Sequence, residues 1–436
     1  MVMCQVNGFI REYIVSQRME ENLVFELGGK CALTTQRTGR HLVILKHWER
    51  DIIVFRSIDF SRLRSLTVFG KWEPFFISEG MKMLRVLDLE DADDLSNADL
   101  YKMVACLHRL KFLSLRGHRE INHLPSSVDH MRQLQTLDVR DTSIVTLPDT
   151  ITKLHKLQYI RAGGTTEAVQ HVSSSWCCRR NLVGVEVPRG IGKLTALHTL
   201  GVLKIGALGA NTIVKQLKKL TQLRKLGVSG INRKNSKQFI ISGLGVYLES
   251  LSVQLDKGSQ GCLDDISLPW QHLTSLKMHG LQDKLPLLGN HLSKLRKLDL
   301  EMAILEKHDV ELLATLPELF ILRLRVKQLQ DGKLHFYVEM YGEELPTYEK
   351  VKVLDISCRS SKLHVTFGSK SMRNLELLKL DCSSASYQLT ALNYLCKLKE
   401  VLLKGTNDEA IKTHLERQLV NHPKPPIVKL EEQSSS

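Results

Sequence analysis

The chain has 436 residues, of which 43% are hydrophobic, so it could hold two or three ordinary domains or one large apolar core. Its formal net charge is +14, which would suit an anionic partner, and it has no stretch of 18 apolar residues that could span a membrane as a helix. The nine cysteines have no metal-ligand spacing, no N-x-S/T sequence occurs, and Arg11 and Glu12 interrupt the first apolar residues. These features predict reduced thiols and an intracellular protein.

Residues 1–39 carry no internal repeat. An apolar pattern near the start has the i, i+3, i+4, i+7 spacing of one helix face, and a polar, glycine-rich stretch follows from Gly28. The residues on this face are Val6, Phe9, Ile10, Tyr13 and Ile14. We therefore expect residues 1–39 to be a short helical segment with a linker, the remnant of a preceding domain. Leu42 and Ile44 have the spacing of an entry strand.

From Leu63 onward, the pattern L-x-x-L-x-L occurs fourteen times, with aliphatic substitutions, and usually every 21 to 26 residues. Its first positions are Leu63, Leu84, Leu110, Leu134, Leu157, Leu197, Leu223, Leu248, Leu273, Leu295, Leu319, Val351, Leu375 and Leu398. A period of about 20 to 29 residues with this pattern is the signature of a leucine-rich repeat. One repeat cannot bury its apolar face alone and must stack on its neighbours. Residues 40–405 are thus predicted to form an α/β leucine-rich repeat solenoid of about 14 to 15 strands, curved, with one parallel sheet on its concave face.

Two spacings are longer than the rest, 40 residues after Leu157 and 32 residues after Leu319. The first contains a Gly/Ser-rich insertion, residues 162–190, with the adjacent Cys177 and Cys178. It could be a plain surface loop or a loop that contacts a partner, since insertions in solenoids often lie on the binding face. The second could hold an extra strand, formed by Leu334, Phe336 and Val338.

The repeat pattern ends at residue 405, and residues 406–436 are predicted to form a C-terminal capping helix and a tail. Polar residues 406–408 can cap the helix, and a helix that covers the last strand protects a solenoid end. The apolar face of the helix is Ala410, Ile411, Leu415 and Leu419, with Pro423 beyond it. The tail, residues 429–436, is predicted to be disordered.

Side chains alternate along a strand, so residues between the leucines should face the concave surface. These positions are acidic at Asp88, basic with aromatic residues over 112–161, and basic again near Arg323. The predicted protein-binding residues are Asp88, Glu90, Phe112, Arg116, Asp138, Arg140, Tyr159, Arg161, Lys277, Arg323 and Arg325. They could be merely solvated, or Phe112, Arg116, Arg140, Tyr159 and Arg161 could form one docking face, since aromatic and Arg residues often anchor interfaces.

Residues 187–248 contain eleven Lys and Arg residues and no Asp or Glu. Within this stretch, a basic interdomain patch is predicted at Lys215, Lys218, Lys219, Arg224 and Lys225. Three interpretations remain open: solvated charges, contact with an acidic protein surface, and nucleic acid. The third is disfavoured because the stretch has no reader motif and no aromatic residues among its charges.

Catalytic patterns are missing from the sequence. There is no H-E-x-x-H, no G-x-S-x-G and no G-x-x-x-x-G-K-[ST] phosphate loop. The acidic pairs Asp93–Asp94 and Asp264–Asp265 suit turns or caps better than acid–base chemistry. We predict no enzyme, and no catalytic, metal-binding or cofactor-binding residues in this chain.

The first residues, CQVNGFIREYIVSQRMEENLVF, resemble the end of the nucleotide-binding module (the NB-ARC winged-helix end) of plant intracellular immune receptors. The resemblance is to the coiled-coil NLR class common in grasses. Cys4, Val6 and Leu42 match that family, whereas Asn7 and Gly8 replace its His-Asp pair. The Leu-Pro return segments and the closing HPKPPIV are similar to the same family.

The resemblance implies a role in plant defence, as the recognition and autoinhibitory part of a disease resistance protein. Its partners would be a pathogen effector or an effector-modified host protein, and the nucleotide-binding module of an NLR. ADP or ATP would bind only in a full-length parent, of which this chain would be a part or a truncated product. The location would be cytoplasmic, nuclear or peripheral to the plasma membrane. The alternative is a free-standing repeat scaffold, such as a ubiquitin-ligase or signalling adaptor without an immune role.

Overall fold

A computed structural model describes most of the chain and divides it into two compact units. The described residues are 24–29, 37–166, 181–206, 210–237, 247–256, 261–262, 271–282, 285–286, 292–329, 332–340, 343–358, 362–381, 386–404, 409–420 and 422–431. Unit 1 comprises residues 1–165, 182–204 and 215–223, and unit 2 comprises residues 166–181, 205–214 and 224–436. The predicted N-terminal helix, Cys177 and Cys178, Asp264 and Asp265 lie outside the described residues.

Unit 1 contains a parallel sheet in which each strand comes from one repeat. Its strands are β1 (Val24–Leu27), β3 (His41–Ile44), β5 (Ser65–Val68), β7 (Val86–Asp88), β9 (Phe112–Ser114), β10 (Thr136–Arg140), β11 (Tyr159–Thr166) and β13 (Thr199–Lys204). Two short pairs accompany it, β2 (Arg37–Thr38) with β4 (Ile58–Asp59) and β6 (Gly70–Lys71) with β8 (Ala92–Asp93). The predicted insertion, residues 162–190, is not all loop in its described part, because β11 continues to Thr166 and a further strand, β12 (Asn181–Val183), lies within it.

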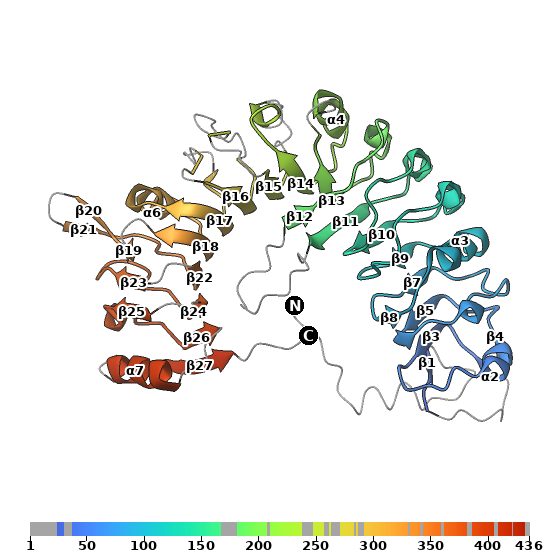
Figure 1. Cartoon of the computed structure of the whole chain (residues 1–436), viewed down its shortest axis with the longest axis horizontal. Coiled ribbons are helices and arrows are strands. Elements are labelled where there is room, and N and C mark those ends of the chain that lie inside the picture. The colour runs from blue at the N-terminus through green and yellow to red at the C-terminus, as the bar shows by residue number, and fades with distance from the viewer. Residues whose placement is uncertain are drawn as a thin grey trace. The chain divides into compact units, whose positions relative to one another are not determined.

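The return segments of unit 1 are short helical turns on the side opposite the strands (Figure 1). They are α2 (Ile52–Arg56), η1 (Pro74–Phe76), α3 (Asn97–Cys106), η2 (Ser126–His130), η3 (Asp149–Lys153) and η4 (Ile191–Lys193). The longest, α3, begins with a capping box between Ser96 and Asp99. Helix α4 (Ala210–Leu217) follows in the chain.

Unit 2 repeats the plan with longer strands. Its parallel sheet is β14 (Lys225–Ile231), β15 (Ser250–Leu255), β16 (Ser275–Leu281), β17 (Lys297–Leu305), β18 (Ile321–Leu329), β22 (Val353–Cys358), β24 (Leu377–Asp381), β26 (Glu400–Lys404) and β27 (Ile427–Glu431). The returns include α6 (Lys307–Ala314), η6 (Leu392–Tyr394) and α7 (Glu409–Leu419). Helix α7 lies where the C-terminal helix was predicted, but it does not end the repeats, because β27 follows it and pairs with β26.

A second, smaller parallel sheet forms part of the returns of unit 2. It consists of β19 (Lys333–Phe336), β23 (Lys362–Phe367) and β25 (Ser386–Thr390), and an antiparallel hairpin, β20 (Val338–Met340) with β21 (Glu343–Leu345), follows β19. Phe336 of β19 and Phe367 of β23 are register partners in this sheet, and their rings stack with centroids 5.8 Å apart. The extra strand predicted after the repeat at Leu319 is present for Leu334 and Phe336, which lie on β19 outside the main sheet, whereas Val338 begins β20 of the hairpin.

The leucines of the repeat pattern form the core. In unit 1, Leu113, Leu137 and Ile160 are direct register partners and are fully buried. Leu298, Leu322 and Leu354 occupy the same positions in unit 2. Burying each such side chain contributes about 2 kcal/mol, which a single repeat could not obtain alone. The predicted α/β leucine-rich repeat solenoid is confirmed.

Three local features differ from the sequence prediction. The sheet of unit 1 begins with β1, one strand before the expected entry strand, because Leu27 is apolar and fully buried beside β3. The predicted disordered tail is wrong for residues 429–431, which pair with β26 as part of β27. In β13, Val202 is partly exposed and Leu203 is buried instead, because Leu203 forms a parallel bridge with Val185, which lies just after β12.

Candidate protein-binding face

The open side of the unit 1 sheet carries the side chains that lie between the core leucines. We call this surface, formed by residues of β7, β9, β10, β11 and the loops that follow them, the unit 1 face. Register pairing places Val86, Phe112, Thr136 and Tyr159 in one row across the strands. The next row is Asp88, Ser114, Asp138 and Arg161. The sequence predicts these residues on one surface, and the strand register brings them together.

Asp138 is the most buried acid of this face, with only 2% of its surface exposed, whereas the alternation pattern predicts an exposed residue. Arg140 covers it. The Nε of Arg140 donates to both carboxylate oxygens, at 2.9 and 3.2 Å, and its Nη2 donates at 2.6 Å. The backbone N–H of Arg140 adds a bond of 3.2 Å, and Arg161 lies 3.6 Å from the same carboxylate. A buried carboxylate needs such partners, because leaving it unpaired costs several kcal/mol.

A second arginine network lies beside the first. Arg116 pairs with Glu90, and its Nε lies 3.6 Å from Asp141. The arginines that the sequence predicts as a basic docking face therefore all face carboxylates of the same chain. Burial raises the pKa of Asp88, and the negative charges of Glu90 and neighbouring acids raise it too. The charge of the face is thus largely balanced, with a local negative potential at its acidic end.

The aromatic residues of the face remain partly exposed. Phe112 and Tyr159 both show part of their surface to solvent, and Tyr159 stacks on His198 with ring centroids 5.9 Å apart. Stacking holds the Tyr159 ring in place before any partner arrives, which lowers the entropy cost of binding. Rings of this kind are common anchors of protein interfaces.

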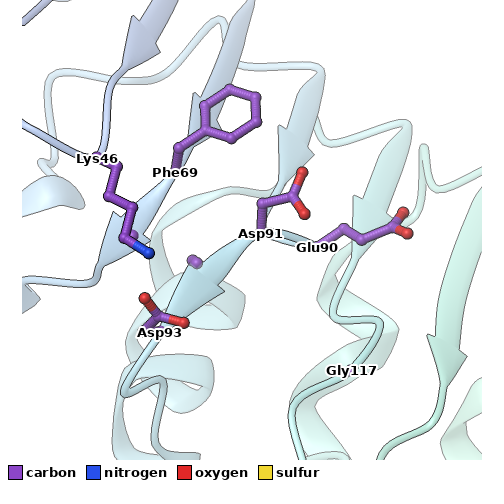
Figure 2. Close-up of a pocket in the computed structure, with 8 residues that line it drawn as sticks. Lys46, Phe69, Glu90, Asp91, Asp93 and Gly117 are labelled. Carbon is purple, nitrogen blue, oxygen red and sulfur yellow. The ribbon is translucent and has the colours of Figure 1, made fainter. Parts of the chain in front are cut away.

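A hollow of about 600 Å³ lies at the acidic end of the face, where strands β3, β5 and β7 give way to loops (Figure 2). Its lining residues are Lys46, Phe69, Gly70, Glu90, Asp91, Ala92, Asp93 and Gly117. Figure 2 shows Glu90 and Asp91 extending from the loop after β7 and Phe69 from the segment after β5. The hollow widens the unit 1 face beyond the strands and adds acidic groups to it.

A comparable surface in unit 2, the unit 2 face, lies on the open side of β15, β16, β17, β18 and β22. Lys277, Asp299, Arg323 and Asp355 alternate in charge along one register row. Asp299 is 2% exposed, pairs with Arg325, and lies 3.4 Å from His279 and 3.9 Å from Arg323. Burial by itself would raise the pKa of Asp299, but the hydrogen bond to His279 and the charge of Arg325 outweigh it and lower the pKa to about 2.

The comparison with protein families agrees with this geometry. The family model described as "Leucine-rich repeat region" matches residues 62–428. The chain belongs to the leucine-rich repeat region family. The match covers most of the described strands of both units.

Curated relatives of this leucine-rich repeat region are disease resistance proteins of plants. Disease resistance protein Pik-2 of Oryza sativa subsp. japonica is 28% identical over 345 residues, which cover 73% of this chain and 33% of that protein. Disease resistance protein RGA4 of the same plant is 27% identical over 339 residues, covering 75% of this chain and 32% of that protein. The chain thus spans about a third of the length of these relatives. The resemblance predicted from the sequence is confirmed for the repeats.

Solved structures with a similar backbone include a TLR13–ssRNA13 complex, with a TM-score of 0.46, 15% identity, and coverage of 88% of this chain and 56% of that chain. Another is an internalin, InlF, from Listeria monocytogenes, with a TM-score of 0.42, 14% identity, and coverage of 83% and 86%.

The residues of the predicted basic patch are divided between the two units of this leucine-rich repeat region. Lys215, on α4, belongs to unit 1 with Lys218 and Lys219, whereas Arg224 and Lys225 belong to unit 2. Arg224 lies 3.6 Å from Glu249. At least one charge of the patch is therefore balanced locally.

Sequence reasoning did not select several residues that complete the two faces. Asp141 follows Arg140 with a positive φ of 58°, so it leaves the strand alternation that the prediction relies on. Gln254 and Asp355 sit at the same alternating positions as the selected residues, and an unbroken reading of the alternation would have found them. In the described part of the chain, no helix is long and apolar enough to cross a membrane, and no cluster of three His, Cys, Asp or Glu residues could hold a metal ion.

Proposed function

We propose that this leucine-rich repeat region is the recognition part of a plant disease resistance protein, a binding module without enzymatic activity. It would bind a pathogen effector, or a host protein that an effector alters, on the unit 1 face. The observation that carries the proposal is the strand register, which aligns Phe112 and Tyr159 beside the paired arginines. The rice relatives support the immune setting by their names, Pik-2 and RGA4 being disease resistance proteins.

A second part of the proposal concerns restraint of a switch. The chain would also contact the nucleotide-binding module of an NLR, through the basic stretch 187–248, and hold it in its off state in the cytoplasm, in the nucleus or at the plasma membrane. The eleven Lys and Arg residues of this stretch, without a single Asp or Glu, support a contact with an acidic surface. A partner bound to the unit 1 face would then shift the equilibrium between the off and on states of the receptor. The size of this shift would be set by how much more tightly the partner binds the on state than the off state. ADP or ATP would be held by the nucleotide-binding module.

The recognition face is tested by co-precipitation in leaf cells with a panel of effectors. We expect the wild-type chain to retain at least one effector, or a host protein only when the effector is present, and Tyr159→Ala and Arg161→Ala to lose it. Lys153→Ala is the matched control, because Lys153 lies in a return segment, 2.9 Å from Asp129, away from the face. Equal retention by the face variants and the control would refute this use of the face, as would a wild-type chain that retains nothing.

The restraint is tested separately, by pull-down with the nucleotide-binding modules of the rice relatives. We expect the wild-type chain to bind one of them and to slow its nucleotide exchange. A variant with Lys215, Lys218 and Lys219 changed to Glu should lose this binding, whereas Lys153→Glu should keep it. Binding that survives the triple change would refute the role of the basic stretch.

A further inference from the structure

Buried polar atoms without a hydrogen-bond partner gather on the unit 2 face. Within the described part of the chain they are Gln254 Oε1, His279 Nδ1 and Arg323 Nε. Gln254 is only 8% exposed and is the register partner of His279 on the next strand. Almost all buried polar groups in proteins find a partner, because an unpaired one costs about 1 to 3 kcal/mol. Their position on the open side of the sheet points to a ligand that supplies the missing partners.

Arg323 has hydrogen-bonding capacity that its neighbours leave unused. Its Nη1 lies 3.9 Å from Asp299 and its Nε lies 3.4 Å from Asp355, and the Nε contact lacks hydrogen-bond geometry. A guanidinium carries five N–H donors in a planar fork that fits a carboxylate. By contrast, Arg325 and His279 both contact Asp299 directly. Arg323 is therefore the cation of this group that can accept a new carboxylate.

The surface potential of the face also favours an anion. Asp299 is 2% exposed beneath the cations, whereas the side chains of Arg323 and Arg325 are 32% and 33% exposed. Burial lowers the pKa of Lys297, and the positive charges of Arg323 and Lys277 lower it further. Asp299 thus lies beneath the cations, and the partly exposed cations of this face, Lys277, Lys297, Arg323 and Arg325, outnumber its partly exposed acids, Glu301 and Asp355.

The spacing of these groups fits an extended segment of polypeptide. Gln254 lies on β15 and Arg323 on β18, three strands away in the sheet. Strands are about 4.8 Å apart and residues about 3.3 Å apart along a strand, so three strands and a register offset of two residues separate the two positions by about 16 Å, which about five extended residues span. We propose that the unit 2 face binds an acidic, extended segment of a partner protein, with a Glu or Asp carboxylate on Arg323 and a backbone N–H on Gln254 Oε1. The inference deepens the proposed function, since it names the chemistry of a partner of the repeat region.

The test uses the full chain and a fluorescently labelled hexaglutamate peptide, with hexaglutamine as the neutral reference, in an anisotropy titration. We expect hexaglutamate to bind and hexaglutamine not to bind. Arg323→Gln should weaken binding about tenfold, because it removes the charged donor for the peptide carboxylate. Gln254→Leu should weaken binding by about the same factor, because it removes the acceptor for the peptide backbone N–H. Lys399→Gln is the matched control in unit 2, because Lys399 is 72% exposed and pairs with Glu376 at 2.5 Å.

Gln254→Leu also separates a ligand-binding role from a structural one. Leucine is close in size to glutamine and removes the unpaired carbonyl, but it also removes the hydrogen bond of 3.3 Å that Gln254 Nε2 donates to the Leu255 carbonyl. These two effects oppose each other, so the melting temperature should change little while peptide binding falls. A fall in both would overturn the proposal, because Gln254 would then be needed for the fold alone. No binding of hexaglutamate, equal binding of hexaglutamine, or an equal loss in Lys399→Gln would overturn it too. If the peptide experiments give one of these results while Tyr159→Ala still loses an effector, the proposed function stands and only this inference is refuted.

Discussion

Replacement of Arg140 by alanine tests the claim that the unit 1 face is built over a buried carboxylate. The change removes three side-chain hydrogen bonds to Asp138, at 2.6, 2.9 and 3.2 Å, and uncovers a carboxylate that is 2% exposed in the wild-type chain. Breaking a buried ion pair on one side costs about 3 to 5 kcal/mol. The lower end applies, because Arg161 at 3.6 Å and the residue 140 backbone N–H at 3.2 Å remain.

We expect Arg140→Ala to lower the free energy of unfolding by about 3 kcal/mol. For a folded unit of about 200 residues, this loss corresponds to a fall in melting temperature of about 6 to 12 °C, measured by circular dichroism. Arg161→Ala should cost less than about 1 kcal/mol, because Arg161 is 47% exposed and its contact with Asp138 is long.

A double-mutant cycle with Asp138→Asn isolates the pair. In that background no buried charge remains, so Arg140→Ala should cost only about 1 kcal/mol, and the coupling between the two changes should be about 2 kcal/mol. The reasoning fails if Arg140→Ala costs less than about 1 kcal/mol in the wild-type chain, or if it costs the same in both backgrounds.

Three further predictions concern single sites. Because the pKa of Asp299 is lowered to about 2, its ion pairs stabilise the fold above about pH 4 and lose this effect as the pH falls from 4 to 2. Over that range, urea unfolding should show the wild-type chain losing about 2 kcal/mol more stability than Asp299→Asn. The same loss of stability with pH in both proteins would contradict the assignment. In thermal unfolding, Leu203→Ala should cost about 3 kcal/mol and Val202→Ala less than about 1 kcal/mol, because only Leu203 is buried. A larger cost for Val202→Ala would mean that Val202 is the buried residue, as the repeat pattern predicts. Gly163→Ala should destabilise unit 1 by more than about 1 kcal/mol, since Gly163 has φ of +82° and a Cβ would lie 2.7 Å from the Val183 carbonyl oxygen. An unchanged melting temperature would contradict this prediction and show that the strand adjusts to the added methyl group.

The faces could be predicted only in part from the sequence. Strand alternation correctly places Phe112 and Tyr159 on the open side of the sheet, because the side-chain period of a strand is two whatever the neighbours are. It cannot tell that Asp138 lies under Arg140, two residues later on the same strand, because this burial depends on the direction that the Arg140 side chain takes and on neighbours from the adjacent strand, such as Arg161. The predicted basic middle of the face is therefore a set of ion pairs.

The repeat period by itself determined the strands, their parallel order and the apolar core of each unit, at Leu137 in unit 1 and Leu298 in unit 2, because leucines at a fixed interval can be buried only by stacking similar repeats. Only the tertiary structure decided the charges that the faces present and the atoms left unpaired at Gln254 and Arg323. Many of those contacts, such as Arg116 with Glu90 and Arg325 with Asp299, join side chains more than twenty residues apart in the sequence that strand register brings together. Arg140 and Asp138, by contrast, lie two residues apart on one strand. The energies of these contacts depend on local burial, on which the repeat spacing carries no information.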